Sequence, residues 1–195
     1  MYLYLDSKSD LKQESYVISV LQEKKGGYYV ELGSGDPKEG NNTLLLETKF
    51  DWSGLAIDWD PELVAKYNKE RKNECIESDA LLFDYVAYFK ENNFPKQIDY
   101  LQVDIDGHDE ALCLLALVAL PMLQYRFSVI TIEHDVCMDY KRASMRDAQR
   151  EILGSLGYEL SAQLLSEDWW VDGRVYQNKG EIDRHFMHPQ YEGEK

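Results

Sequence analysis

The sequence predicts an α/β domain with a central, mostly parallel β-sheet and helices on both of its faces. Short runs rich in β-branched and aromatic residues alternate with helical segments between residues 28 and 157. This alternation is typical of parallel strands that are joined by right-handed crossovers. Polar clusters follow the ends of the predicted strands. Because ligands of open α/β sheets bind beyond the carboxyl ends of the strands, these clusters indicate one binding edge.

Local patterns predict the elements in order along the chain. The strands are short apolar runs at 28–32, 54–58, 74–77, 98–103 and 128–132. The helices are 11–25, 42–49, a segment that opens at Asp60-Pro61, 82–92, 109–119 and 142–156. Asp60 and Pro61 suit the N-cap and the first helical position, and glycines follow the first and last helices. Residues 158–175 are predicted to form a terminal antiparallel hairpin.

The length of the chain fits a single domain, because 195 residues suffice for one full hydrophobic core. We expect an N-terminal helix or cap at 1–27, a core at 28–176 and a polar tail at 177–195. The apolar run 111–123 is shorter than the about 20 residues that a membrane-spanning helix needs, so it predicts a buried helix.

The formal net charge of −15 argues against a nucleic-acid partner and against binding to an anionic membrane surface. The first ten residues lack the basic and apolar regions of a signal peptide. Cys75, Cys113 and Cys137 show neither metal-binding spacing nor a disulfide framework, which predicts free thiols in a reducing compartment. We therefore expect a cytoplasmic protein without a membrane-inserted segment.

A glycine-rich turn follows the first predicted strand. Gly33 and Gly35, with Ser34 between them, permit a tight turn and the close approach of a ligand. A dinucleotide-binding loop needs a third glycine, but Lys38 stands at that position, so the loop suits a pyrophosphate poorly. Glu31 suits the cationic amino-acid end of a ligand instead. The alternative is an ordinary turn between a strand and a helix.

The second and third strands end in residues that suit a nucleoside. Asp58 has the spacing from Gly33 that allows an acid to accept both hydroxyls of a ribose. Trp59 offers a flat face for an adenine ring, and Asp79 can accept a hydrogen bond from the adenine amino group. The alternatives are that Trp59 packs against the protein and that Asp79 caps a helix.

An acidic motif follows the fourth strand. Two carboxylates as close in sequence as Asp104 and Asp106 are costly unless a cation or a bound proton compensates them. Glu133 follows the neighbouring strand. These three residues predict a Mg²⁺ or Mn²⁺ site. The alternative, which the residues favour slightly, is that Asp104 and Glu133 contact a methionine moiety without a metal.

Taken together, the motifs resemble the FkbM-type methyltransferases, which use S-adenosylmethionine (SAM). The segments 30–36, 41–47 and 52–58 are similar to the family's V-E-x-G-x-x-D-G loop, S-N-T-x-x-L-E helix and G-W-x-G-x-x-I-E strand. The segments 99–109 and 129–134 are similar to its D-Y-L-S-x-D-x-E-G and V-I-x-x-E-H motifs. The sequence departs from the family at Asp36-Pro37, where the loop has D-G, and at Asp58 and Asp106, where the family has glutamate.

This resemblance, which covers roughly residues 28–171, implies a Rossmann-like class I methyltransferase fold with SAM as the methyl donor. It also implies O-methylation, frequently of sugar hydroxyls. Carried over by position, the cofactor-binding residues are Glu31, Gly33, Gly35, Asp58, Asp79 and Asp104. We expect Ser34, Asn42 and Trp59 to bind the cofactor as well. The expected acceptor is a small molecule or a glycan, and the expected assembly is a homodimer or a fusion to another glycan-processing domain.

Methyl transfer to a hydroxyl requires that the hydroxyl proton be removed. His134 is the first candidate base, because it follows the fifth strand and imidazole titrates in the useful range. His108 is the second candidate, and Asp104 lies at the reacting end.

Trp169-Trp170 predicts either a stacking platform for a sugar or, more simply, core packing. Rival functions are a non-catalytic nucleoside-binding module, an acidic interaction domain and a nicotinamide-dependent reductase.

Overall fold

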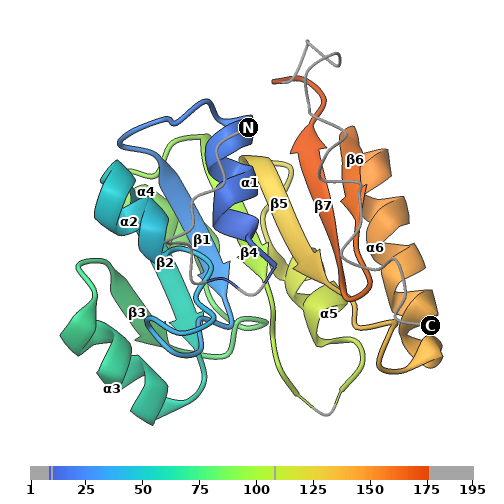
Figure 1. Cartoon of the computed structure of the whole chain (residues 1–195), viewed down its shortest axis with the longest axis horizontal. Coiled ribbons are helices and arrows are strands. Elements are labelled where there is room, and N and C mark those ends of the chain that lie inside the picture. The colour runs from blue at the N-terminus through green and yellow to red at the C-terminus, as the bar shows by residue number, and fades with distance from the viewer. Residues whose placement is uncertain (1–8, 10, 108, 176–195) are drawn as a thin grey trace, which may run out of the picture.

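The computed structural model describes residues 9, 11–107 and 109–175. Its strands form one sheet in the order β3-β2-β1-β4-β5-β7-β6 (Figure 1). The strands are β1 (Tyr28–Leu32), β2 (Ser53–Asp58), β3 (Glu74–Glu77), β4 (Gln97–Val103), β5 (Arg126–Glu133), β6 (Tyr158–Gln163) and β7 (Glu167–Asp172). β1 to β5 are parallel, whereas β7 pairs antiparallel with both β5 and β6. This confirms the predicted parallel sheet and its C-terminal antiparallel hairpin.

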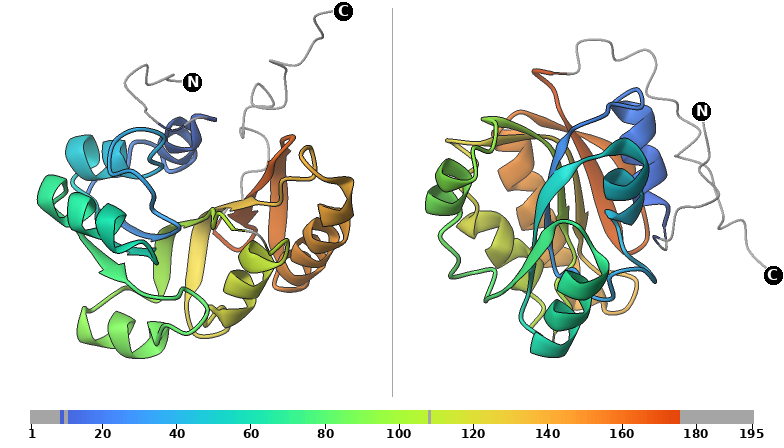
Figure 2. Two further views of the ribbon diagram at one scale, coloured as in Figure 1. Left: turned by 90° about the horizontal axis from the view of Figure 1, so that it is seen from below. Right: turned by 90° about the vertical axis from the view of Figure 1, so that its left-hand side faces the viewer.

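Helices cover both faces of the sheet (Figure 2). One face carries α1 (Gln13–Val20), α2 (Leu44–Phe50) and α3 (Pro61–Glu70), and the other carries α4 (Tyr85–Glu91), α5 (Leu112–Ala119) and α6 (Ala143–Ser155). A 3₁₀ turn, η1 (Tyr140–Arg142), leads into α6. Alternate residues of each central strand point to opposite faces, so each face has its own apolar core.

The strand order reverses between β1 and β4, and this reversal positions the site. The chain passes from β1 outward to β2 and β3, and then returns to β4 on the other side of β1. Leu32 lies level with Ile57 of β2 and with Val103 of β4. The residues that follow these three therefore lie at the same level at one edge of the sheet. Open α/β sheets bind their ligands at such a point.

The first helix is shorter than the predicted 11–25 and ends at Val20. The reason is the backbone that follows: Gln22, Glu23 and Gly26 have φ values of 53°, 58° and 64°. Residues in this left-handed region cannot continue a right-handed helix. The predicted start of α3 is confirmed, because Asp60 accepts hydrogen bonds from the backbone N–H groups of Glu62 and Leu63.

The apolar run 111–123 is predicted to form a buried helix, but in the structure it is only partly buried. α5 buries Cys113, Ala116 and Leu117 against the sheet, while Val118 is 61% exposed and Leu123 is 89% exposed. The helix packs on the sheet through one side, so Leu115 and Val118 on its other side are exposed. Within the described ranges, no helix has the length and apolar character to cross a membrane.

The tryptophan pair at the end of the chain is structural. Trp169 and Trp170 of β7 are 1% and 4% exposed and point into the two opposite cores. They therefore follow the packing alternative and do not supply a platform for a sugar. The predicted polar tail at 177–195, with His185 and His188, lies outside the described residues.

Candidate functional site

Two adjoining cavities lie at the carboxyl edge of the sheet. The cavity beside β3, here called the β3-side cavity, has a volume of about 340 Å³. The cavity beside the loop after β1, here called the loop cavity, has a volume of about 460 Å³. Both are lined by Gly33, Asp58, Trp59, Ile105, Asp106 and Gly107. Because they share these walls, the two cavities form one groove across the point where the strand order reverses.

Gly33 sets the floor of the groove. Its φ is 78°, and its N–H donates to the carbonyl of Ile57 at 2.9 Å. A Cβ atom at this position would lie 1.8 Å from the carbonyl oxygen of Asp104. Only glycine fits here, because both the backbone conformation and the close approach of β4 exclude a side chain. The glycine-rich turn thus brings the end of β1 against the end of β4.

Asp58 links the end of β2 to the same loop. Its Oδ2 accepts from the N–H of Gly35 at 2.8 Å, and its Oδ1 accepts from the N–H of Asp60 at 3.0 Å. The residue is 6% exposed and lines both cavities. A carboxylate has about four lone-pair sites, so each oxygen keeps the capacity to accept a further hydrogen bond from a ligand hydroxyl.

The β3-side cavity is apolar and has a polar end. Among its lining residues are Ile57, Ala80, Leu81, Ile105 and Leu112. Trp59 is 72% exposed and lines both cavities, so its ring is available to a ligand. Asp79 also lines this cavity. Its Oδ1 accepts from the N–H of Leu81 at 2.8 Å, and the cap of α4 is Asp84 instead.

Ser34 and Asn42 line the loop cavity, as does Asp104. Ser34 Oγ lies 3.3 Å from Cys75 Sγ. The Asn42 side chain is buried, and its Oδ1 has no hydrogen-bond partner among the described residues. A buried acceptor without a donor is costly, so Asn42 marks a position where a ligand N–H or O–H group would be favourable.

Arg71, which follows α3, holds the distal half of the loop after β1. Its Nη1 donates to Asn41 Oδ1 at 2.8 Å and to the carbonyl of Pro37 at 3.1 Å. Its Nε donates to Glu47 Oε1 at 3.1 Å, and its Nη2 donates to Thr43 Oγ1 at 3.0 Å. Arg71 is not predictable from the sequence, because nothing in its spacing signals a contact with a loop about thirty positions earlier.

Glu31 lies behind this loop and not in the groove. It is 1% exposed, accepts from Thr43 Oγ1 at 2.8 Å and from the Tyr67 hydroxyl at 3.4 Å, and lines neither cavity. Burial raises its pKa to about 7. The structure therefore gives Glu31 a supporting position, in contrast to the direct contact with a cationic ligand that the sequence analysis expected.

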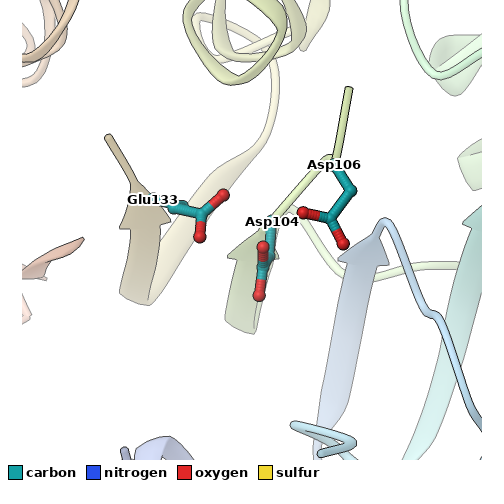
Figure 3. Close-up of side chains that lie close together, drawn as sticks. All are labelled: Asp104, Asp106 and Glu133. Carbon is teal, nitrogen blue, oxygen red and sulfur yellow. The ribbon is translucent and has the colours of Figure 1, made fainter. Parts of the chain in front are cut away.

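Asp104 and Asp106, which follow β4, lie close to Glu133, the last residue of β5 (Figure 3). One oxygen from each lies within 4.8 Å of the others. Asp104 and Asp106 line the loop cavity. Burial, followed by the carboxylates of Asp104 and Asp135, raises the pKa of Glu133 to about 10.

A raised pKa favours the protonated form of Glu133, which has no negative charge to add to the cluster. Carboxylate oxygens at this spacing also suit a hard divalent cation, whose ligands lie about 2.0–2.6 Å from the ion. The metal set Asp104, Asp106 and Glu133 stays a prediction.

His134 lies away from the groove. It is 6% exposed, its Nδ1 accepts from the N–H of Val136 at 3.2 Å, and it lines neither cavity. An imidazole that accepts through Nδ1 carries its proton on Nε2, and this atom lies 3.7 Å from Asp168 Oδ1. Asp168 in turn pairs with Arg150 at 2.6 Å. His134 is thus packed toward β7 and α6 and is poorly placed to act as a base. His108, the second candidate, lies outside the described residues.

The strand order with an antiparallel β7 between β5 and β6, together with the groove at the reversal point, defines a Rossmann-like class I methyltransferase fold. The fold is similar to that of the METTL16 methyltransferase domain, with a TM-score of 0.56 and 15% identity over 83% of this chain and 65% of that one. It is also similar to human methyltransferase-like protein 13 in complex with S-adenosylhomocysteine (SAH), with a TM-score of 0.52 and 14% identity over 93% of this chain and 82% of that one.

A third similar structure is a candidate rRNA-methylase from Clostridium thermocellum, with a TM-score of 0.54 and 13% identity over 86% of this chain and 99% of that one. No family model and no curated protein matches the chain. Likeness at these identities shows the fold. The more specific FkbM-type assignment stays a prediction.

Proposed function

We propose that the chain is a SAM-dependent methyltransferase that binds its cofactor in the groove formed by the two cavities. The observation that carries this proposal is the position of Asp58 at their junction, where its carboxylate contacts the loop after β1 and lines both cavities. An acid at the end of the second strand is placed to accept the hydroxyls of a ribose.

The cofactor fits the groove with its adenine in the β3-side cavity. The apolar walls and the exposed ring of Trp59 suit a flat ring, and Asp79 is available to the adenine amino group. Gly33, Gly35 and Asp104, which line the loop cavity, would then hold the methionine part. The sulfonium of the bound cofactor would supply the methyl group.

The reaction is an in-line displacement, in which a nucleophile attacks the methyl carbon and the sulfur leaves as a neutral thioether. Most of the rate enhancement comes from holding the two reactants in line. The acceptor binds beside Asp104 and Asp106. Sugar hydroxyls, which the FkbM-type resemblance implies, donate hydrogen bonds to carboxylates, and so do amines.

Ligand selectivity tests the proposed function against its rivals. Thermal unfolding would be followed with SAM, SAH, adenosine, NADH and NADPH at equal concentrations, because a ligand that binds only the folded state raises the midpoint, and a tighter ligand raises it further. We expect SAM and SAH to raise the midpoint and NADH and NADPH to leave it unchanged. Stabilisation by NADH alone would favour a reductase, and no response to any nucleoside would favour an interaction domain.

A further inference from the structure

We propose that the methyl acceptor is an amine that binds as a cation between Asp104, Asp106 and Asn42 in the loop cavity. This inference rests on the proposed function and names the acceptor class for the same site. Three observations support it. These are the negative charge of the groove, the lack of a described partner for the Asp106 carboxylate, and the buried amide oxygen of Asn42.

The groove is lined by carboxylates and, among the described residues, by no lysine, arginine or histidine. The acids are Asp36, Glu39, Asp58, Asp60, Asp79, Asp104 and Asp106. Several of them have local roles: Lys66 pairs with Asp36, and Asp58, Asp60 and Asp79 accept hydrogen bonds from backbone N–H groups. None of the residues that the structure describes forms a hydrogen bond or an ion pair with Asp106.

Asn42 supplies a second indication of a ligand in the loop cavity. The residue is 5% exposed and lines that cavity, and no described donor reaches its Oδ1. An ammonium group carries three N–H donors and no acceptor. Such a group suits a site that combines the Asn42 oxygen with the carboxylates of Asp104 and Asp106.

Bound SAM does not satisfy the charge of the groove. Its sulfonium and ammonium groups are cationic and its carboxylate is anionic, so the cofactor brings one net positive charge to several carboxylates. The remaining negative charge attracts a second cation and repels a phosphate or a nucleic acid. The formal net charge of −15 acts in the same direction over a longer range.

The chemical step is balanced without a further reactant. The bound ammonium loses one proton to solvent water, which leaves a neutral amine. The nitrogen lone pair attacks the methyl carbon of the sulfonium, and the carbon–sulfur bond breaks with its electron pair on sulfur. The products are SAH and a methylated ammonium.

Matched acceptors test this inference. Putrescine and 1,4-butanediol differ only in amine against hydroxyl, and glucosamine and glucose differ likewise at one ring position. Each would be titrated calorimetrically into the SAH complex at pH 7, and its methylation would be measured as SAH release from SAM. We expect the amines to bind at least about tenfold more tightly than the alcohols, as a charge-assisted hydrogen bond implies, and to be the compounds that are methylated.

Asp106→Asn removes one charge and keeps the size of the side chain. We expect it to weaken amine binding by about tenfold, more than it weakens SAH binding. Glu91→Gln, which makes the same charge change at an exposed position at the end of α4, is expected to leave both affinities unchanged.

Equal or tighter binding of the alcohols, acceptor binding that requires Mg²⁺, or no binding of any amine to the SAH complex would overturn the inference. In each of these cases SAH still binds, and the proposed function stands. If SAH itself does not bind, the proposed function and the inference fall together.

Discussion

The carboxylate of Asp58 accepts a hydrogen bond from the N–H of Gly35 at 2.8 Å, so the end of β2 holds the loop that follows β1. The same side chain lines both cavities of the groove. One residue therefore shapes the cofactor loop and faces the position expected for the ribose. Substitutions in this region are therefore expected to act on stability and on ligand affinity to different extents.

Gly33→Ala is expected to destabilise the fold strongly. The added Cβ would lie 1.8 Å from the carbonyl oxygen of Asp104, and the φ of 78° is unfavourable for alanine. We expect a loss of about 2 kcal/mol or more in the free energy of unfolding, measured with urea, together with loss of SAH binding. Gly154→Ala in α6 is the matched control, because nothing lies within 4 Å of its added Cβ. Equal effects of the two substitutions would contradict the account.

Arg71→Met should loosen the distal half of the loop. It removes the donors to Asn41, Thr43 and Glu47 and leaves the Glu47 carboxylate buried without its ion pair. We expect a destabilisation of about 3–5 kcal/mol and weaker SAH binding in the fraction that folds.

The matched control for this change is Arg146→Met, because Arg146 pairs with the exposed Asp147 on the surface of α6. Surface ion pairs contribute about 0–1 kcal/mol, so this variant should unfold almost like the wild type. If Arg71→Met retained wild-type stability and affinity, the role assigned to this arginine would be wrong.

Stability should fall as the pH rises from about 5 to about 8. Burial raises the pKa of Glu31 to about 7 and that of Glu167 to about 8. An acid whose folded pKa is raised contributes stability that is fully present below its unfolded pKa and is lost as the pH passes through the folded value. We expect these two residues to reduce the free energy of unfolding by a few kcal/mol, on the order of 1.4 kcal/mol for each unit of pKa shift.

Urea unfolding at pH 5.5 and at pH 8.5 measures this difference. Glu31→Gln and Glu167→Gln should each flatten the pH dependence, because a neutral amide does not titrate. Wild-type stability that rises over this interval would show that the two carboxyls are not buried as described.

Trp59→Leu is expected to weaken SAH binding without affecting stability. The ring is 72% exposed, so the folded protein loses little packing, but the adenine loses its stacking partner. Stacking contributes about 0.5–1.5 kcal/mol, which predicts a loss of up to about tenfold in affinity. Tyr140→Leu, at a 79% exposed residue that lines neither cavity, is the control. Unchanged SAH affinity of Trp59→Leu would place the adenine elsewhere.

The sheet and its binding edge were predictable because both follow from local sequence. Apolar β-branched runs fix the strands, and the register that places Leu32 level with Ile57 and Val103 brings the residues after them to one edge. The prediction of Asp58, Asp79 and Asp104 as groove residues needed only strand ends and their order.

Side chains whose direction depends on distant partners were not predictable. Glu31 turns toward Thr43 and Tyr67, and Arg71 reaches a loop far back in the sequence. His134 follows the correct strand, but its ring packs toward Asp168 and Arg150. Sequence order places a residue at an edge of the sheet, whereas contacts across the fold decide which space its side chain enters.

Calorimetric titration with SAH tests the central claim most directly, with wild-type protein, Asp58→Ala and the distant control Glu91→Ala. The account predicts micromolar affinity for the wild type and the control, and a loss of about 10-fold to 100-fold in Asp58→Ala, because the ribose loses hydrogen bonds to a charged acceptor. Equal affinity in all three proteins would remove Asp58 from the cofactor site. No binding to the wild type would contradict the claim that this groove holds a methyl donor.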